Sequence, residues 1–156
     1  MCDSIGQYEV DIAYLVETNT NWKLSSSAAS FKSTKKRHWR HSHSITSETA
    51  IGWSDIYKLG GTTIINLPPF SSVITTSGSD TYGLDRWSYI TTKGQDHNNL
   101  TIISVYRVCQ TSITNIGPTK NTIQQWKRLE EKHLEDTNIR DLMIIDLANF
   151  ITTLHN

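Results

Sequence analysis

The sequence changes its hydrophobic periodicity at Gly117-Pro118, and this change narrows the possible folds more than any other feature. Before it, short runs rich in Ile, Val and Thr alternate with turn residues. After it, apolar residues recur at intervals of three and four residues. Runs of β-branched residues favour strands, whereas the second spacing favours amphipathic helices. The sequence therefore predicts an α/β protein whose strands precede most of its helices.

The strand region contains one clear hairpin and several shorter runs. Residues 86–108 form the hairpin in this prediction, because two β-branched and aromatic runs flank a polar turn that contains Gly94. Residues 10–17 are predicted to be a strand buried on both faces, because apolar residues occupy both sides of its alternation. Further strands are expected over residues 41–49, 62–67 and 72–76.

Two helices are predicted near the end of the chain. The first spans residues 119–134, with Thr119 as its N-cap. The second spans residues 139–154, where apolar residues follow one stripe. Residues 23–39 are ambiguous, because their apolar positions fit a helix while the serines between them are poor helix formers.

Length and composition indicate the broad class of protein. A chain of 156 residues can form one domain with its own core and is too short for two. The 15 Lys and Arg balance the 15 Asp and Glu, so attraction to nucleic acid would have to come from a local patch. Cys2 and Cys109 make no disulfide framework, and the N-terminus lacks the features of a signal peptide. An intracellular protein with no membrane partner is therefore expected.

The carboxylate of Glu17 is the first candidate site residue. It ends the apolar strand predicted over residues 10–17, where a sheet edge can present its oxygens to a hard divalent cation. Thr18 and Asn19 follow, and they suit hydrogen bonds to such a carboxylate or to waters bound by the cation. A solvated glutamate followed by an ordinary polar turn also fits these residues.

The second candidate is the pair Tyr106-Arg107, at the end of the second hairpin strand. A phenol and a guanidinium at this position can both donate hydrogen bonds to a phosphate, and the guanidinium can do so through two parallel bonds. The alternative is that Tyr106 is a core aromatic residue whose hydroxyl reaches the rim.

Several segments, taken in order, resemble one known family. Residues 11–18, Asp-Ile-Ala-Tyr-Leu-Val-Glu-Thr, resemble the DIxxLQET strand of the endonuclease/exonuclease/phosphatase family. Its retroelement-associated branch is similar in further marks. In this chain these marks are Arg86-Trp87, Ser-Val-Tyr-Arg-Val-Cys at residues 104–109, Gly117-Pro118 and Gln124-Gln125.

This resemblance implies a fold and an activity. The fold would be a partial two-sheet α/β sandwich with helices packed outside the sheets. The activity would be magnesium-dependent hydrolysis of phosphodiester bonds in DNA. In that case Glu17 holds the magnesium and Tyr106 the scissile phosphate, while Arg107 and Asn19 contact the substrate.

The same resemblance marks what this chain lacks. The family's first strand, with its metal-site Asn, should precede residue 10, and too few residues stand there. The Gly-Asp-x-Asn strand is not found. Residues 144–149 come nearest to it, but Asp146 is expected on the solvent side of a helix. The Ser-Asp-His segment that supplies the general base is also missing. Residues 1–156 are therefore expected to form a single, incomplete nuclease-like domain that is inactive alone and exposes an edge strand and apolar surface.

A competing hypothesis is a non-catalytic nucleic-acid-binding or vestigial domain. The basic run at residues 35–40 contains Trp39, and cations mixed with an aromatic residue are typical of a surface that grips a backbone and stacks a base. A solvated basic turn also explains a run this short. His38, His41 and His43 have no Cys or carboxylate beside them and are not expected to hold zinc.

Overall fold

The computed structural model describes residues 5, 7–47, 60–107, 120–134 and 136–154. It contains helices and two small antiparallel sheets, which confirms the α/β class. In chain order the elements are β1 (Ile12–Val16), α2 (Ser25–His38), β2 (His43–Thr46), β3 (Thr62–Asn66), η1 (Phe70–Val73), β4 (Ile74–Ser79), β5 (Trp87–Lys93), η2 (Gln95–His97), β6 (Asn99–Val105), α3 (Lys120–Glu131) and α4 (Ile139–Thr153). The predicted hairpin is the pair β5 and β6.

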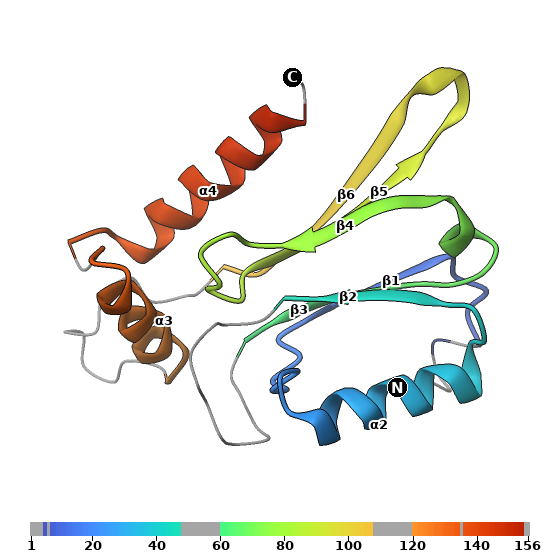
Figure 1. The fold of residues 1–156 in the computed structure, drawn as a ribbon, viewed down its shortest axis with the longest axis horizontal. Helices are drawn as coiled ribbons and strands as arrows, with labels where there is room; N and C mark the ends of the chain where they lie inside the picture. The colour runs from blue at the N-terminus through green and yellow to red at the C-terminus, as the bar shows by residue number, and fades with distance from the viewer. Residues whose placement is uncertain (1–4, 6, 48–59, 108–119, 135, 155–156) are drawn as a thin grey trace.

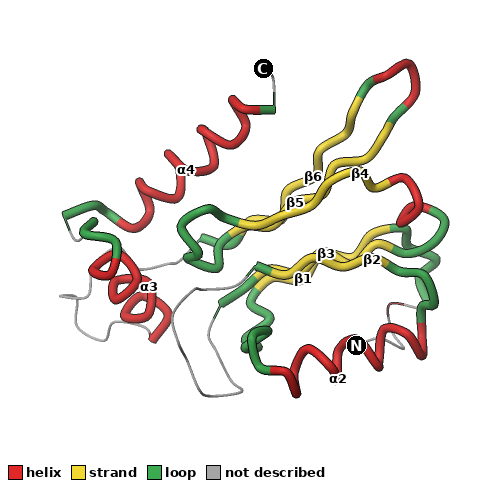
Figure 2. The backbone as a smooth tube through the Cα atoms, in the orientation of Figure 1, coloured by secondary structure: helices red, strands yellow, loops and turns green. Residues whose placement is uncertain are grey.

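The two sheets face each other as layers (Figures 1 and 2). One has the strand order β1-β3-β2 and the other β4-β5-β6. Helix α2 lies on the outer side of the first sheet, and α4 on the outer side of the second (Figure 2). The ring of Phe150 on α4 contacts Trp87 and Tyr89 of β5, with centroid distances of 4.7 and 4.5 Å.

The central strand of each sheet supplies the core between the layers. Every residue of β3 is buried. Ile64, on the same face of β3 as Thr62, and Ile90, on the same face of β5 as Ser88, are fully inaccessible to solvent, and so is Ile65 on the opposite face of β3. Each such side chain contributes about 1.5–3 kcal/mol relative to an exposed one. Hydroxyl groups also form a hydrogen bond between the two sheets, since Oγ1 of Thr62 lies 2.9 Å from Oγ of Ser88. The two sheets are therefore joined by a hydrogen bond as well as by apolar packing.

The prediction that residues 10–17 are buried on both faces is wrong. Strand β1 lies at the edge of its sheet and pairs with β3 alone. The side chains of Tyr14 and Val16 are consequently 46% and 54% exposed. Large apolar side chains elsewhere are exposed too, among them Leu100, Ile144 and Ile145. An exposed edge strand and exposed apolar surface were both expected, whereas their cause stays a prediction.

The helices follow the predicted pattern, with adjustments at their ends. Helix α4 confirms the helix expected from residue 139, and the side chain of Asn138 caps it by accepting from the backbone N–H of Arg140 at 2.9 Å. The predicted N-cap Thr119 lies outside the described residues. Helix α3 ends at Glu131, because His133 turns to a φ of +55° and Leu134 N–H then reaches back to Leu129 O at 2.9 Å.

The ambiguous segment at residues 23–39 is largely helical. Helix α2 occupies it despite its serines. Cations fill its last turn, where they interact favourably with the helix dipole. The ring of Phe31 also packs on Trp22, with centroids 4.9 Å apart. Tertiary packing and end charges therefore decide a segment whose intrinsic propensity is weak.

Candidate functional site

Strand pairing places Glu17 and Tyr106 at the same end of the two-sheet core. Val16, which precedes Glu17, lies opposite Thr62 in the first sheet. Thr62 bonds across the layers to Ser88, and Ser88 lies opposite Ser104 in the second sheet. Tyr106 follows two residues later. Strand pairing thus brings the two residues to one end of facing strands, whereas the convergence of their side chains on one cleft stays a prediction.

The backbone at Glu17 is strained. Glu17 has a φ of +53° and Asn19 a φ of +51°, in the left-handed region that residues other than glycine rarely adopt. For a glutamate such a conformation costs of the order of 1–3 kcal/mol and persists only where surrounding contacts fix it, whereas an asparagine adopts it more readily. These contacts come from Gly60 and Gly61. Thr18 N–H donates to Gly61 O at 3.3 Å, and Asn19 N–H donates to Gly60 O at 2.9 Å. The result is an exposed carboxylate on a fixed backbone.

Asn19 serves the structure of this loop. Its side-chain oxygen accepts from the backbone N–H of Gly60 at 2.9 Å. Together with the backbone bond in the other direction, this contact holds the end of β1 against the start of β3. The contact of Asn19 with substrate stays a prediction.

A second carboxylate, which the sequence reasoning did not single out, lies behind the loop. Asp85 is only 3% exposed, and its Oδ1 accepts from Ser47 Oγ at 2.7 Å. A Cβ atom at Gly61 would stand 2.6 Å from Thr18 Oγ1 and 3.3 Å from Asp85 Oδ1. Gly61 thus lets the loop that carries Glu17 approach Asp85, and a side chain there would force them apart. The Gly-Gly pair before β3 was the available sequence signal.

These residues do not by themselves complete a magnesium site. Magnesium takes oxygen ligands in octahedral geometry, usually one or two carboxylates with waters or phosphate. Within the described ranges, no group of three or more His, Cys, Asp or Glu side chains is placed to hold a metal. Glu17 offers one exposed carboxylate, while Asp85 is buried and bonded to Ser47. The other ligands of a magnesium ion would have to come from elsewhere.

Tyr106 packs against the hydrophobic core, as the alternative interpretation of this residue predicts. Its ring packs against the buried cluster of Leu84, Leu129, Ile139 and Leu142. Its backbone N–H donates to Arg86 O at 2.6 Å, which continues the β5–β6 pairing past the strand. Its half-buried ring therefore belongs to the core, and Arg107 beside it is exposed. Phosphate contacts of the two side chains stay a prediction.

Two of the family-like marks meet in one buried network. The guanidinium of Arg86 is 1% exposed and donates to Gln125 Oε1 through Nε at 3.2 Å and Nη2 at 2.8 Å. Its Nη1 donates to Ile139 O. Gln125 Nε2 in turn donates to Leu84 O at 3.0 Å. Burial lowers the pKa of Arg86 to about 10. These residues join β5 to α3 and α4, and their role here is structural. The marks at Cys109 and Gly117-Pro118 lie outside the described residues.

The prediction that Asp146 lies on the solvent side of its helix is wrong. The carboxylate is 8% exposed and accepts from Thr81 Oγ1 at 2.6 Å and from Trp87 Nε1 at 2.9 Å. It occupies the face of α4 that is buried, together with Ile139, Leu142 and Met143. The spacing of three and four residues along that face was the sequence signal. Asp146 anchors α4 to the second sheet.

The carboxyl group of Asp80 is also buried in this region, and its pKa is strongly raised. Its Oδ2 accepts from the backbone N–H groups of Leu84 at 2.9 Å and Arg86 at 3.1 Å. Its Oδ1 is buried and has no hydrogen-bond partner within the part of the chain that the structure describes. Burial, aided by the charges of Asp85 and Asp146, raises the pKa of Asp80 from 3.8 to about 7.

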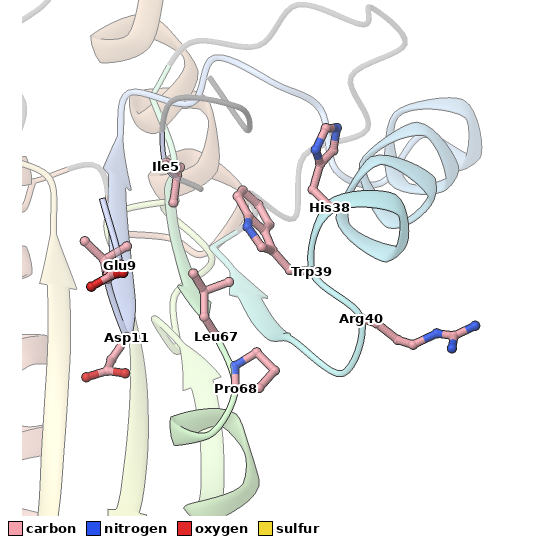
Figure 3. A pocket seen from close by; sticks show the side chains of 9 residues that line it. Ile5, Glu9, Asp11, His38, Trp39, Arg40, Leu67 and Pro68 are labelled. Atoms are coloured by element: carbon pink, nitrogen blue, oxygen red, sulfur yellow. The ribbon is translucent and has the colours of Figure 1, made fainter. Parts of the chain in front are cut away.

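A cavity of about 460 Å³ lies at the other end of the first sheet (Figure 3). Its lining includes Trp39 and Arg40 from the basic run, together with Glu9 and Asp11. Figure 3 shows the side chain of Arg40 directed away from the cavity and the two carboxylates on the opposite wall. Carboxylates in this wall repel a phosphate backbone, so the cavity does not favour the nucleic-acid-binding hypothesis.

The basic run itself does not present all its cations to solvent. Nζ of Lys35 donates to Ser44 Oγ at 2.7 Å, and burial with the charge of Lys32 lowers the pKa of Lys35. Burial and the charge of Lys35 likewise lower the pKa of His43. The three histidines of this region belong to no group that could hold a metal within the described residues.

Among the described helices, none has the length and apolar character needed to cross a membrane. Comparison of the chain with family models, with curated proteins and with solved structures yields no match.

Proposed function

We propose that residues 1–156 are the middle part of a magnesium-dependent phosphodiesterase domain that acts on DNA. The domain would be of the endonuclease/exonuclease/phosphatase type and derived from a retroelement. The observation that carries the proposal is the shared location of Glu17 and Tyr106, which strand pairing brings to one end of the two facing sheets. The helices on the outer sides of both sheets also support it.

The proposed roles follow from exposure and chemistry. Glu17 is an exposed carboxylate on a fixed, left-handed backbone, so it would supply one ligand of the metal. Arg107 is exposed at the same end and would donate two parallel hydrogen bonds to a substrate phosphate. Tyr106 would contact the same phosphate through its hydroxyl. The remaining metal ligands and the general base would be supplied by protein outside these residues.

The isolated chain is expected to show no magnesium-dependent cleavage. One carboxylate holds magnesium only at roughly millimolar concentrations or above, because the ion keeps its waters unless several oxygens replace them. Without a base to activate water, a phosphate contact gives little rate enhancement. Plasmid nicking and cleavage of abasic DNA by the purified chain should equal the background of Glu17→Gln. Cleavage that disappears in Glu17→Gln would show that a complete active site exists within residues 1–156.

The protein extended in its reading frame gives the positive test. The encoded sequence beyond Asn156 should contain a Gly-Asp-x-Asn strand and a Ser-Asp-His segment, and the extended protein should cleave abasic DNA with magnesium. Glu17→Gln should then reduce kcat/KM by orders of magnitude. Glu9→Gln is the matched control, since Glu9 is an exposed glutamate at the other end of the first sheet. Equal activity of the Glu17→Gln and Glu9→Gln proteins would reject the role of Glu17.

A further inference from the structure

A second cavity opens beside Glu17 and is lined by residues from the end of β1, the following loop and helix α2. Its volume is about 220 Å³. Besides Glu17, the lining consists of Leu15, Val16, Thr18, Thr20, Trp22 and Phe31. Most of this lining is aliphatic or aromatic, and Glu17 is its one charged member. The cavity therefore suits a flat, largely apolar group that carries a hydrogen-bond donor.

The aromatic part of the wall is held in place. The rings of Trp22 and Phe31 have centroids 4.9 Å apart and planes inclined at 53°. Nε1–H of Trp22 donates to Thr18 Oγ1 at 3.3 Å. Thr18 itself is fixed by its backbone hydrogen bond to Gly61. An aromatic wall that is ordered before binding loses little side-chain entropy when a ligand arrives.

The volume of the cavity and the charge of Glu17 restrict the ligands that would fit. An apolar cavity of about 150 Å³ holds a benzene ring. A cavity of about 220 Å³ accordingly fits one somewhat larger planar ring system, the size of a nucleobase. The carboxylate of Glu17 repels phosphate, so the sugar-phosphate backbone would stay outside. A carboxylate accepts from an exocyclic amino group, which cytosine and adenine present, whereas thymine has a carbonyl oxygen in that position.

We propose that this cavity binds one nucleobase with an exocyclic amino group, stacked on Trp22 and Phe31 and hydrogen-bonded to Glu17. The base would belong to a DNA strand that lies at the end of the two sheets where Glu17 and Tyr106 are found. Only this source of the base rests on the proposed function. A carboxylate has two oxygens, so a bond to the base through one leaves the other open to a cation. Base binding needs neither magnesium nor cleavage.

The test uses single-stranded oligomers built from abasic residues, with one central cytosine, one central thymine or no base. Binding to the full chain is measured by fluorescence anisotropy in EDTA. The cytosine oligomer should bind about 10-fold more tightly than the all-abasic oligomer, which is within the range of one base stacked on an aromatic side chain. The thymine oligomer should bind more weakly than the cytosine oligomer. Equal affinities for the cytosine and all-abasic oligomers would overturn the proposal.

Matched variants locate the base. Trp22→Leu should remove the advantage of the cytosine oligomer, whereas Trp39→Leu, in the cavity at the other end of the sheet, should preserve it. Glu17→Gln should abolish the preference for cytosine over thymine, because an amide both donates and accepts. A loss in Trp39→Leu equal to that in Trp22→Leu would refute the proposed location.

A photochemical measurement keeps the test independent of folding defects in the variants. An abasic oligomer with one 5-iodocytosine should cross-link to Trp22 or Phe31 of the unaltered chain, as mass spectrometry can show. Cross-links found only at other residues would contradict the proposal. Because all these measurements are made without magnesium, base binding can fail while the extended protein still cleaves DNA, and the reverse is also distinguishable.

Discussion

Replacing Arg86 with methionine is expected to lower the free energy of unfolding by about 3–5 kcal/mol, a large share of the stability of a small domain. Arg86 is 1% exposed, and its three donor nitrogens bond to Gln125 Oε1 and Ile139 O. Methionine fills a similar volume but leaves these buried acceptors without a donor, at about 1–3 kcal/mol for each group. Urea unfolding followed by far-UV circular dichroism measures the loss.

Two further variants distinguish the loss of the buried hydrogen bonds from the loss of the positive charge. Arg40→Met removes a cation from an exposed side chain and should change stability by no more than about 0.5 kcal/mol. Arg86→Lys should remain destabilised, because an ammonium group cannot reproduce the planar fork that reaches Gln125 and Ile139 together. A loss of less than about 1 kcal/mol in Arg86→Met would show that the network contributes little to folding.

Part of this fold could be predicted from the sequence, and part could not. The hairpin of β5 and β6 and helix α4 were predictable, because local periodicity and turn residues specify both. The exposure of β1 was not, since an apolar run does not reveal whether a strand has a neighbour on each side. Helix α2 has weak propensity and depends on contacts such as that between Trp22 and Phe31.

Some residues of the candidate site could likewise be predicted from the sequence, and others could not. Glu17 and Tyr106 were identified at strand ends, and strand order then accounts for their common location. Buried acids were missed, because a polar residue in the core is recognisable only once its distant partners are known. Asp146 bonds to Thr81 and Trp87, and Asp85 bonds to Ser47, all far away in the sequence. The strained backbone of Glu17 likewise depends on Gly60 and Gly61, which follow a long intervening segment.

Asp80→Asn is expected to make the protein more stable than the parent above pH 7. Burial raises the pKa of Asp80 from 3.8 to about 7, so the folded state holds its proton more tightly than the unfolded state. Its contribution to stability is complete below about pH 4 and is lost as the pH rises to about 7. The difference between the two pKa values corresponds to about 4 kcal/mol. Asparagine has no proton to lose here, and its carbonyl oxygen can still accept from the N–H groups of Leu84 and Arg86.

Urea unfolding at pH values from 4 to 8 tests this expectation through the difference between variant and parent, since the other acids titrate in both proteins. The difference should be small near pH 4 and should grow in favour of Asp80→Asn up to about pH 7, beyond which it should stay constant. Asp136→Asn is the control, because Asp136 is exposed and its replacement should leave the pH dependence unchanged. An Asp80→Asn protein that is less stable than the parent at pH 8 would mean that the ionised carboxylate stabilises the fold. Its interaction with the buried charge of Arg86 would then outweigh the cost of burying both groups.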